Sequence, residues 1–370
     1  MCQAIGASVK PAKEKIIDFL LSHAGPSIVL RVKKEILSCL SSAEENDLLD
    51  RILQEKNVQT VIQSQKPDGW FGNYFHGQSG KFGAGMFDNM EVGLRYLAEK
   101  GFPPDNERVA KAVNSFLAKE PYDYAAYRIK QPEAPDTDYT YTAYGLYLMR
   151  SSVIIRAGHE CRLPKNAFID LKRDIDFSLK TFANALNYAG ANDAIDERGK
   201  KLCFKPGTRW ACMYDLRMLA HSQGWRSEKN ISLLAGSVSR LFSFPQSGED
   251  VYTYRKGQFI SPAWAFIHKP ILGSIKDKAV GSTWLDLMEL FARCGIVNQV
   301  SALKSEYESL LALIDGGCNL GANFSAKRSE INWSPYYGIA IEEDWKTVKK
   351  KRCDILFRVL LIIHYAERHS

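Results

Sequence analysis

The chain has 370 residues, of which 45% are hydrophobic, 25% charged and 11% aromatic. This is the composition of an ordinary folded protein, and it excludes a disordered or fibrous chain. The formal net charge of +7, from 49 Lys and Arg against 42 Asp and Glu, is spread along the sequence and does not favour nucleic acid as a partner.

The cysteines and the apolar segments indicate where in the cell the protein is expected. The eight cysteines include no C-x-x-C pair, which argues against a disulfide framework or a thiolate metal cluster and fits a reducing, cytoplasmic location. Residues 1–15 lack the apolar segment of a secretory signal. The longest apolar run, 355–365, is shorter than the roughly 20 residues that span a bilayer, so we expect no membrane span.

One pattern recurs along the chain: an apolar segment of helical period, a glycine, a few polar residues and a second such segment. Its glycines are Gly25, Gly101, Gly158, Gly224 and Gly295. A glycine directly after a helical pattern predicts a left-handed cap, because glycine has no Cβ to clash at positive φ. Each instance therefore predicts a helix–turn–helix hairpin, and residues 1–50 contain a candidate peripheral hairpin.

These hairpins, about 60 to 70 residues apart, must stack on one another because a single hairpin cannot bury its own apolar face. A last helix is expected over 344–367, and the basic run at 346–352 is expected to be a solvated helix face. We predict a mainly α chain of about eleven helices, forming a single helical-repeat domain over residues 1–370. The hairpins are expected to close into an α/α toroid; the alternative is an open α-solenoid of the HEAT type.

Long connections that pair Phe with Trp separate the hairpins. They lie at 65–77, 201–210, 256–264 and 323–333. If the glycine turns lie at one end of a barrel, these connections lie at the other and surround its mouth. We therefore expect a small-molecule ligand to bind in a central pocket at that mouth.

The first connection carries a resemblance to a known family. Its sequence Q-S-Q-K-P-D-G-W-F-G, residues 63–72, resembles the Q-x-x-D-G-x-W element of the squalene cyclase and prenyltransferase repeat superfamily. Members of that superfamily are α/α toroids with this element in connections between helices. The resemblance thus implies the same fold over most of the chain.

A second element points to one branch of that superfamily. Class II terpene cyclases protonate an alkene or epoxide with a D-x-D-D element, and the nearest match here is Asp136-Thr137-Asp138-Tyr139. The resemblance implies Asp138 as the acid, kept protonated by Asp136 and a dry aromatic pocket. The alternative is that Asp136 caps a helix and Asp138 complements its dipole.

Aromatic and polar side chains near the connections are the candidate ligand-binding residues, since aromatic faces stack on sugars or stabilise a carbocation. They are Trp70, His76, Tyr139, Tyr141, Arg209, Trp210, Tyr214, Trp264, Trp333 and Tyr336. Helix packing is the alternative explanation for each aromatic residue taken singly. Asp215 and Arg217 are two residues apart, so they do not face each other on a helix and each needs another partner.

Metal and cofactor motifs are not found. Protein prenyltransferase β subunits bind zinc through Asp, Cys and His, and Asp315, Cys318 and His364 offer those types, but the spacing here is D-x-x-C rather than D-x-C. The sequence has no H-E-x-x-H, P-loop, G-x-G-x-x-G or G-x-S-x-G. We therefore expect no metal and no cofactor.

Three functions fit this pattern. The first is a terpene-cyclase-like enzyme that starts a cyclisation or isomerisation of an apolar molecule by protonation. The second is a non-catalytic helical-repeat module that binds protein or nucleic acid. The third is a carbohydrate-active α/α-toroid enzyme in which carboxylates do acid and base work.

Overall fold

The computed structural model of the chain describes residues 2–76, 87–119, 143–158, 160, 163, 165–244, 251–255, 257–260, 265–266, 282–315, 333–336 and 338–368. The predicted residues Asp136, Asp138, Tyr139, Tyr141 and Trp264 lie outside this set. Within it, the chain forms thirteen α-helices and four short strands, so the prediction of a mainly α protein is confirmed. The finer predictions, a closed toroid or an open solenoid, stay predictions.

The elements follow one another in this order. The α-helices are α1 (Cys2–His23), α2 (Pro26–Arg31), α3 (Ser42–Leu53), α4 (Lys56–Gln63), α5 (Met90–Lys100), α6 (Glu107–Leu117), α8 (Ala143–Arg156), α9 (Lys165–Ala183), α10 (Met213–His221), α11 (Glu228–Ser243), α12 (Ser282–Arg293), α13 (Ser301–Asp315) and α16 (Val348–Arg368). A short π-helix, η1 (Val32–Ile36), follows α2, and two short 3-10 helices, η2 (Asn184–Asn187) and η3 (Ala191–Asp193), follow α9.

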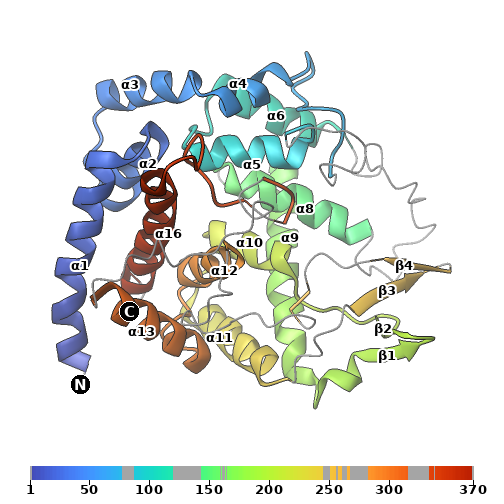
Figure 1. Cartoon of the computed structure of the whole chain (residues 1–370). Coiled ribbons are helices and arrows are strands. Elements are labelled where there is room, and N and C mark those ends of the chain that lie inside the picture. Colours follow the sequence, from blue (N-terminus) through green and yellow to red (C-terminus); the bar gives the residue numbers. More distant parts are fainter. Residues whose placement is uncertain are drawn as a thin grey trace.

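From α5 onward, the described helices divide into an inner and an outer set (Figure 1). Helices α5, α8, α10, α12 and α16 pack against one another in that order and form the inner set. On the outside, α6 packs against α5, α9 against α8 and α10, α13 against α1 and α11, and α1 against α16. The apolar core lies between the two sets and includes residues of both.

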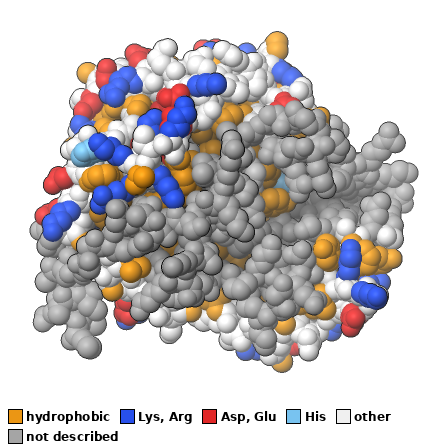
Figure 2. Space-filling view, viewed as in Figure 1, with side chains coloured by type: hydrophobic (Ala, Val, Ile, Leu, Met, Phe, Trp, Pro, Cys, Tyr) orange, Lys and Arg blue, Asp and Glu red, His pale blue; other side chains and the backbone are white. Residues whose placement is uncertain are grey.

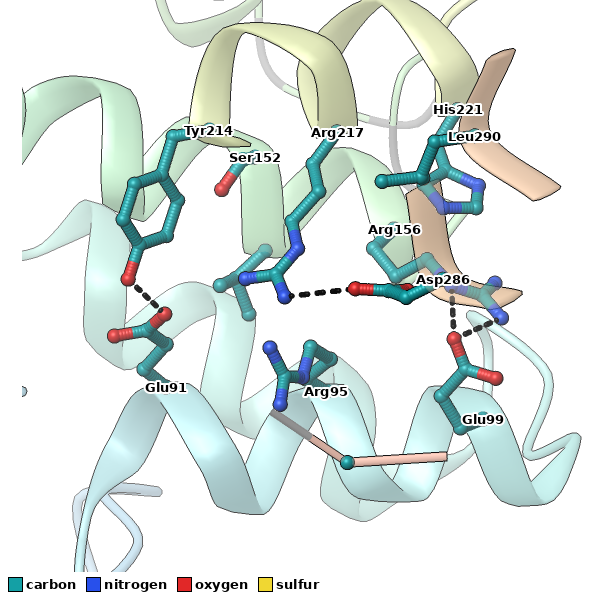
Figure 3. Close-up of a pocket in the computed structure, with 12 residues that line it drawn as sticks. Glu91, Arg95, Glu99, Ser152, Arg156, Tyr214, Arg217, His221, Asp286 and Leu290 are labelled. Atoms are coloured by element: carbon teal, nitrogen blue, oxygen red, sulfur yellow. Dashed lines mark hydrogen bonds and ion pairs between the residues drawn. The ribbon is translucent and has the colours of Figure 1, made fainter. Parts of the chain in front are cut away.

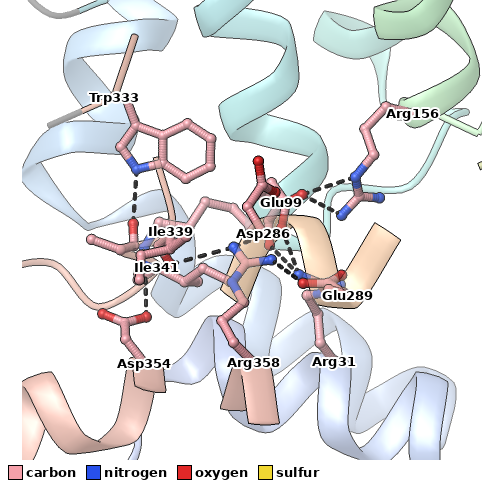
Figure 4. A network of polar contacts seen from close by, with 12 residues as sticks. Arg31, Glu99, Arg156, Asp286, Glu289, Trp333, Ile339, Ile341, Asp354 and Arg358 are labelled. Atoms are coloured by element: carbon pink, nitrogen blue, oxygen red, sulfur yellow. Dashed lines mark hydrogen bonds and ion pairs between the residues drawn. The ribbon is translucent and has the colours of Figure 1, made fainter. Parts of the chain in front are cut away.

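The inner helices are buried on nearly all sides, yet each carries polar residues at helical spacing. Every residue of α5 is buried, and its Glu91, Arg95 and Glu99 are four residues apart, which puts them on one face. Matching positions on the other inner helices are Ser152 and Arg156 on α8, Tyr214, Arg217 and His221 on α10, Asp286, Glu289 and Arg293 on α12, and Arg358 on α16. The polar faces meet between the inner helices (Figures 3 and 4).

The glycine turns were predicted correctly at three of the five positions. Gly101, Gly158 and Gly295 have φ of 95°, 79° and 78°, the left-handed conformation expected after a helix. The prediction is wrong at Gly25, which precedes α2 with φ of −67° and donates its N–H to Glu342 Oε1 at 2.7 Å. It is also wrong at Gly224, which has no positive φ.

Two of the predicted connections contain strands instead of irregular loops. Strand β1 (Ile195–Arg198) pairs antiparallel with β2 (Lys201–Phe204), β2 pairs parallel with β3 (Val251–Arg255), and β3 pairs antiparallel with β4 (Gln258–Ile260). The sheet order is β1-β2-β3-β4. Arg198 is opposite Lys201, so the β1–β2 loop has two residues, and its first, Gly199, has the positive φ of 66° that such tight hairpins need.

The surface mixes positive and negative side chains on the described part of the face in Figure 2. Residues 346–349 of the basic run are exposed, which confirms a solvated segment there, although α16 itself begins at Val348. Within the described ranges, no helix combines the length and apolar character needed to cross a bilayer.

Candidate functional site

Residues 65–76 form a compact turn whose path depends on two glycines. Gly69 and Gly72 have φ of 95° and 64°. A Cβ at Gly69 would lie 2.4 Å from the backbone oxygen of Lys111, and one at Gly72 would lie 2.4 Å from the backbone carbon of Asp88. Both positions therefore require glycine, for conformation and for space.

This turn is hydrogen-bonded to the start of α5. The Met90 N–H donates to the Tyr74 carbonyl at 2.8 Å, and the Glu91 N–H donates to the Phe75 carbonyl at 3.2 Å. The next residue, His76, is thereby held beside the first turn of α5. The predicted loop histidine thus lies against an inner helix.

Glu91, His76 and Tyr336 form a chain of hydrogen bonds, which we call the relay. His76 Nδ1 lies 2.7 Å from Glu91 Oε2, and the Tyr336 hydroxyl lies 3.2 Å from His76 Nε2. An ionised carboxylate only accepts, so these partners assign the proton to Nδ1, and in the neutral ring Nε2 accepts from Tyr336. The order carboxylate, imidazole, hydroxyl is that of an activated catalytic triad.

Tyr214 completes the binding of Glu91. Its hydroxyl donates to Glu91 Oε1 at 2.6 Å (Figure 3). Burial alone would raise the pKa of Glu91, but the charge and hydrogen bond of His76, the charge of Arg95 and the hydrogen bond from Tyr214 outweigh it, so the pKa lies below its ordinary value. Burial and the Glu91 carboxylate raise the pKa of Tyr214 well above its ordinary value. At neutral pH, Glu91 is therefore ionised and Tyr214 is a protonated donor.

Two arginines hold the segment that carries Tyr336. Arg95 donates to the carbonyls of Pro335 and Ser334 at 2.9 and 2.5 Å, and Arg217 donates to the Pro335 carbonyl at 2.7 Å. Burial and the nearby Arg217 lower the pKa of Arg95 to about 10. Fixing a backbone by two guanidinium groups pre-organises the hydroxyl that the relay uses.

A cavity lies between the inner helices, next to Glu91 and Tyr214 (Figure 3). Its described lining is Glu91, Arg95, Glu99, Ser152, Val153, Arg156, Tyr214, Arg217, His221, Asp286, Leu290 and Gly338. The space open to the centre of a water molecule is about 20 Å³, enough for about one water. Six of these twelve residues are charged and only Tyr214 and His221 carry an aromatic ring, in contrast to the aromatic lining expected for a central pocket.

The structure brings together three of the predicted site residues, His76, Tyr214 and Tyr336. They come from the 65–76 turn, the start of α10 and the segment 333–336, which are far apart in the sequence. Their convergence on Glu91 was not predicted.

The other described candidates lie in buried aromatic clusters or against neighbouring rings. Trp70 is edge-on to Phe116 with centroids 5.5 Å apart, and Trp210 stacks on Tyr188 at 5.5 Å. Trp333 donates its indole N–H to the Ala340 carbonyl at 2.8 Å, and the Arg209 guanidinium lies 4.2 Å from the ring centroid of Phe177. None of these four is among the residues that line the cavity, so their role in binding stays a prediction.

Sequence reasoning missed Glu91 and Arg95, although a signal existed. The segment M-E-V-G-L-R-Y-L-A-E-K places charges at every fourth position of an otherwise apolar helix, a pattern that indicates a buried polar face. The separate partners expected for Asp215 and Arg217 are confirmed, because Asp215 accepts from the Cys212 N–H at 2.9 Å and Arg217 binds the Pro335 carbonyl.

Comparison with protein-family models, curated proteins and solved structures finds no match. The resemblance to the squalene cyclase and prenyltransferase superfamily therefore stays a prediction. Across the described ranges, no group of three or more His, Cys, Asp or Glu side chains is placed to hold a metal ion.

Proposed function

We propose that this chain is an α/α-toroid enzyme that transfers protons on a small polyhydroxylated molecule of the carbohydrate class. The relay of Glu91, His76 and Tyr336 does the acid–base work. The observation that carries the proposal is the pair of contacts made by one imidazole, 2.7 Å to a buried carboxylate and 3.2 Å to a tyrosine hydroxyl.

The division of the helices into an inner and an outer set supports the toroid part of the proposal. Successive inner helices from α5 to α16 pack side by side, and the first outer helix, α1, packs against the last inner one. Contact between the two ends of the series is what closure requires and what an open solenoid lacks.

The relay suits proton transfer better than nucleophilic attack by a carboxylate. Both oxygens of Glu91 are engaged, one by His76 and one by Tyr214, so Glu91 orients the imidazole and keeps its Nδ1 protonated. His76 Nε2 then takes the proton of Tyr336 as the phenol oxygen accepts one from the substrate. In an elimination the proton then passes to the leaving oxygen as its bond to carbon breaks, and in an isomerisation it returns to another atom of the same molecule. Both are acid–base steps of the kind that contributes about 10²- to 10⁴-fold in rate, whereas double-displacement hydrolysis needs a free carboxylate.

The charged lining separates this proposal from acid-initiated terpene cyclisation. A carbocation requires a dry, aromatic pocket, while arginines and carboxylates line the described cavity. The terpene-cyclase-like function depends on Asp138 and Asp136, which lie outside the described residues, and it stays a prediction, as does the non-catalytic binding module.

The test is a product search with matched variants. The full chain is incubated with neutral and uronic-acid-containing oligosaccharides, and the masses of the products are measured by mass spectrometry. Hydrolysis adds the mass of one water to the products, whereas elimination adds none. We expect His76→Asn and Tyr336→Phe to reduce turnover by about 10²- to 10⁴-fold. His23→Asn, at a surface histidine bonded to the Phe19 carbonyl, and Tyr254→Phe, at a 39% exposed tyrosine, serve as controls.

Equal turnover in the relay variants and the controls would contradict the proposal, and so would the absence of product from the whole panel. Loss of activity on Asp138→Asn alone, with the relay variants fully active, would instead assign the acid–base work to Asp138.

A further inference from the structure

Three arginines and three glutamates form a closed ring of ion pairs next to the cavity, and Figure 4 shows four of them, Arg31, Glu99, Glu289 and Arg358. Around the ring the pairs are Glu35–Arg31 at 2.5 Å, Arg31–Glu99 at 2.8 Å, Glu99–Arg358 at 3.1 Å, Arg358–Glu289 at 2.8 Å, Glu289–Arg293 at 2.8 Å and Arg293–Glu35 at 3.4 Å. The signs alternate, so each charge has two opposite neighbours. The ring is electrically neutral.

Arg156 of α8 adds a positive charge to this neutral ring. Its Nε and Nη2 lie 2.9 and 2.8 Å from Glu99 Oε1, while Glu99 Oε2 already binds Arg31 and Arg358. One carboxylate therefore serves three guanidinium groups. Burial, Arg31 and Arg293 lower the pKa of Arg156, against the pull of Glu99.

The neighbouring carboxylates have other partners. Asp286 pairs with Arg217 at 3.4 Å. Asp354, one turn before Arg358 on α16, accepts from the backbone N–H groups of Ile341 and Glu342 (Figure 4). Among the described residues, the charge of Arg156 has only the shared Glu99 as its ion-pair partner.

His221 lies on the same side of the cavity as Arg156 (Figure 3). Burial and the charges of Arg156 and Arg293 lower the pKa of His221 well below its ordinary value, so its ring is neutral at neutral pH. Within the described part of the chain, the ring nitrogens of His221 have no hydrogen-bond partner. A neutral imidazole always carries one N–H, so this wall of the cavity combines a free donor with a cation whose carboxylate is shared with two other arginines.

We propose that the cavity binds a small monoanion, paired with Arg156 and hydrogen-bonded by His221. The free space of about 20 Å³ suits a halide ion or the end of a carboxylate and is too small for a phosphate. The anion comes either from solution or from the acidic group of a substrate such as a uronic acid. The second source rests on the proposed function; the first does not.

Crystals of the full chain soaked in bromide give a direct test. An anomalous peak between Arg156 and His221 is the expected result. Absence of a peak in the cavity, with peaks elsewhere on the same molecule, would overturn the proposal for an anion from solution and leave only the carboxylate of a substrate.

Binding in solution is measured on the wild type and on matched variants. The unfolding temperature of the wild type is expected to rise saturably with chloride or formate at constant ionic strength. Arg156→Gln should weaken the apparent affinity by roughly tenfold to a hundredfold, the range for a charge-assisted hydrogen bond. It should still fold, because Arg31 and Arg358 continue to pair with Glu99.

His221→Phe keeps a ring of similar shape, removes the N–H and should also weaken binding. Arg240→Gln, which removes an arginine that is bonded to the Tyr188 carbonyl and does not line the cavity, is the control and should respond as the wild type does. An identical anion response in the wild type and Arg156→Gln would refute the site.

A second arm identifies the source of the anion. If free formate and chloride have no effect, while an oligosaccharide with a uronic acid stabilises the wild type and not Arg156→Gln, the ligand is the carboxylate of the substrate. If a neutral oligosaccharide acts equally, the proposal fails. Binding is measured without turnover. The anion site can therefore be confirmed or refuted whatever the activity assay shows for the relay.

Discussion

The substitution Glu91→Gln reverses the direction of the relay. The carboxylate accepts from both His76 and Tyr214. A glutamine keeps one acceptor oxygen, for the Tyr214 hydroxyl, but turns an N–H₂ group toward His76 Nδ1. The imidazole must then accept at Nδ1 and carry its proton on Nε2, where it can no longer accept the proton of Tyr336.

The magnitude follows from the two hydrogen bonds. Bonds to a charged acceptor contribute about 1.5 to 3 kcal/mol each and neutral bonds about 1 kcal/mol, so exchanging both bonds should lower the free energy of unfolding by about 1 to 4 kcal/mol. The pKa of Glu91 is lowered in the fold, so its contribution is present above the unfolded pKa of about 4.3 and is lost as pH falls through the folded pKa. The variant should lose this acid dependence.

Long-range ¹H–¹⁵N spectra of the histidine rings measure the tautomer without any substrate. For the neutral ring, we expect the proton of His76 on Nδ1 in the wild type and on Nε2 in Glu91→Gln. Tyr214→Phe removes the bond to Glu91 Oε1 and the 3.5 Å contact with His76 Nδ1, but it leaves the bond between Glu91 and His76 in place and should keep the wild-type tautomer. A neutral His76 protonated at Nε2 in the wild type would refute the reasoning.

Three further predictions concern stability. Burial raises the pKa of Glu342 to about 7, so the folded state holds this proton more tightly than the unfolded state. The free energy of unfolding should therefore fall by about 3 kcal/mol as pH rises from about 4.5 to 7. Chemical denaturation should show this fall in the wild type and in Glu343→Gln, a change at an exposed neighbour, but not in Glu342→Gln. Arg358→Met should lower the free energy of unfolding by about 1.5 to 3 kcal/mol, because Glu99 and Glu289 each lose one charged partner but keep Arg31 and Arg293; a loss below about 1 kcal/mol would mean that the ring does not stabilise the fold. Gly69→Ala should cost more than about 1 kcal/mol, since φ is 95°, and a neutral result in thermal unfolding would contradict the strained turn.

Local patterns predicted much of the fold. The hairpins at Gly101, Gly158 and Gly295 were found because a helix period followed by glycine is decided within a few residues. The prediction was wrong at Gly25 and Gly224 because contacts from elsewhere in the chain, such as the Glu342 carboxylate at Gly25, fix those turns. The β1–β2 hairpin was missed although Gly199 and its two-residue loop are local.

The candidate site was predictable only in part. His76 was favoured because a glycine-flanked loop has no core of its own to bury it, and the structure places it in the relay. Its partner Glu91 was not predicted, because tertiary packing decides which segments that are far apart in the sequence meet. Trp70 and Trp210 illustrate the opposite problem, since burying a large ring gains about 1.5 to 3 kcal/mol and a connection rich in aromatics packs into the core for that reason alone.

The buried charges of the inner helices are hard to explain by stability. Replacing a buried ion-pair network with apolar residues of similar volume is often neutral or stabilising, and leucine or methionine would suit these helices. The ring of Arg31, Glu99, Glu289 and Arg358 with Glu35 and Arg293 instead joins η1 and α2 to α5, α12 and α16. Directional contacts fix the rotation of each helix about its axis, which apolar packing specifies less strictly. Rotation of α5 sets where Glu91 points, so the ring that binds Glu99 at one end of the helix also orients the relay at the other.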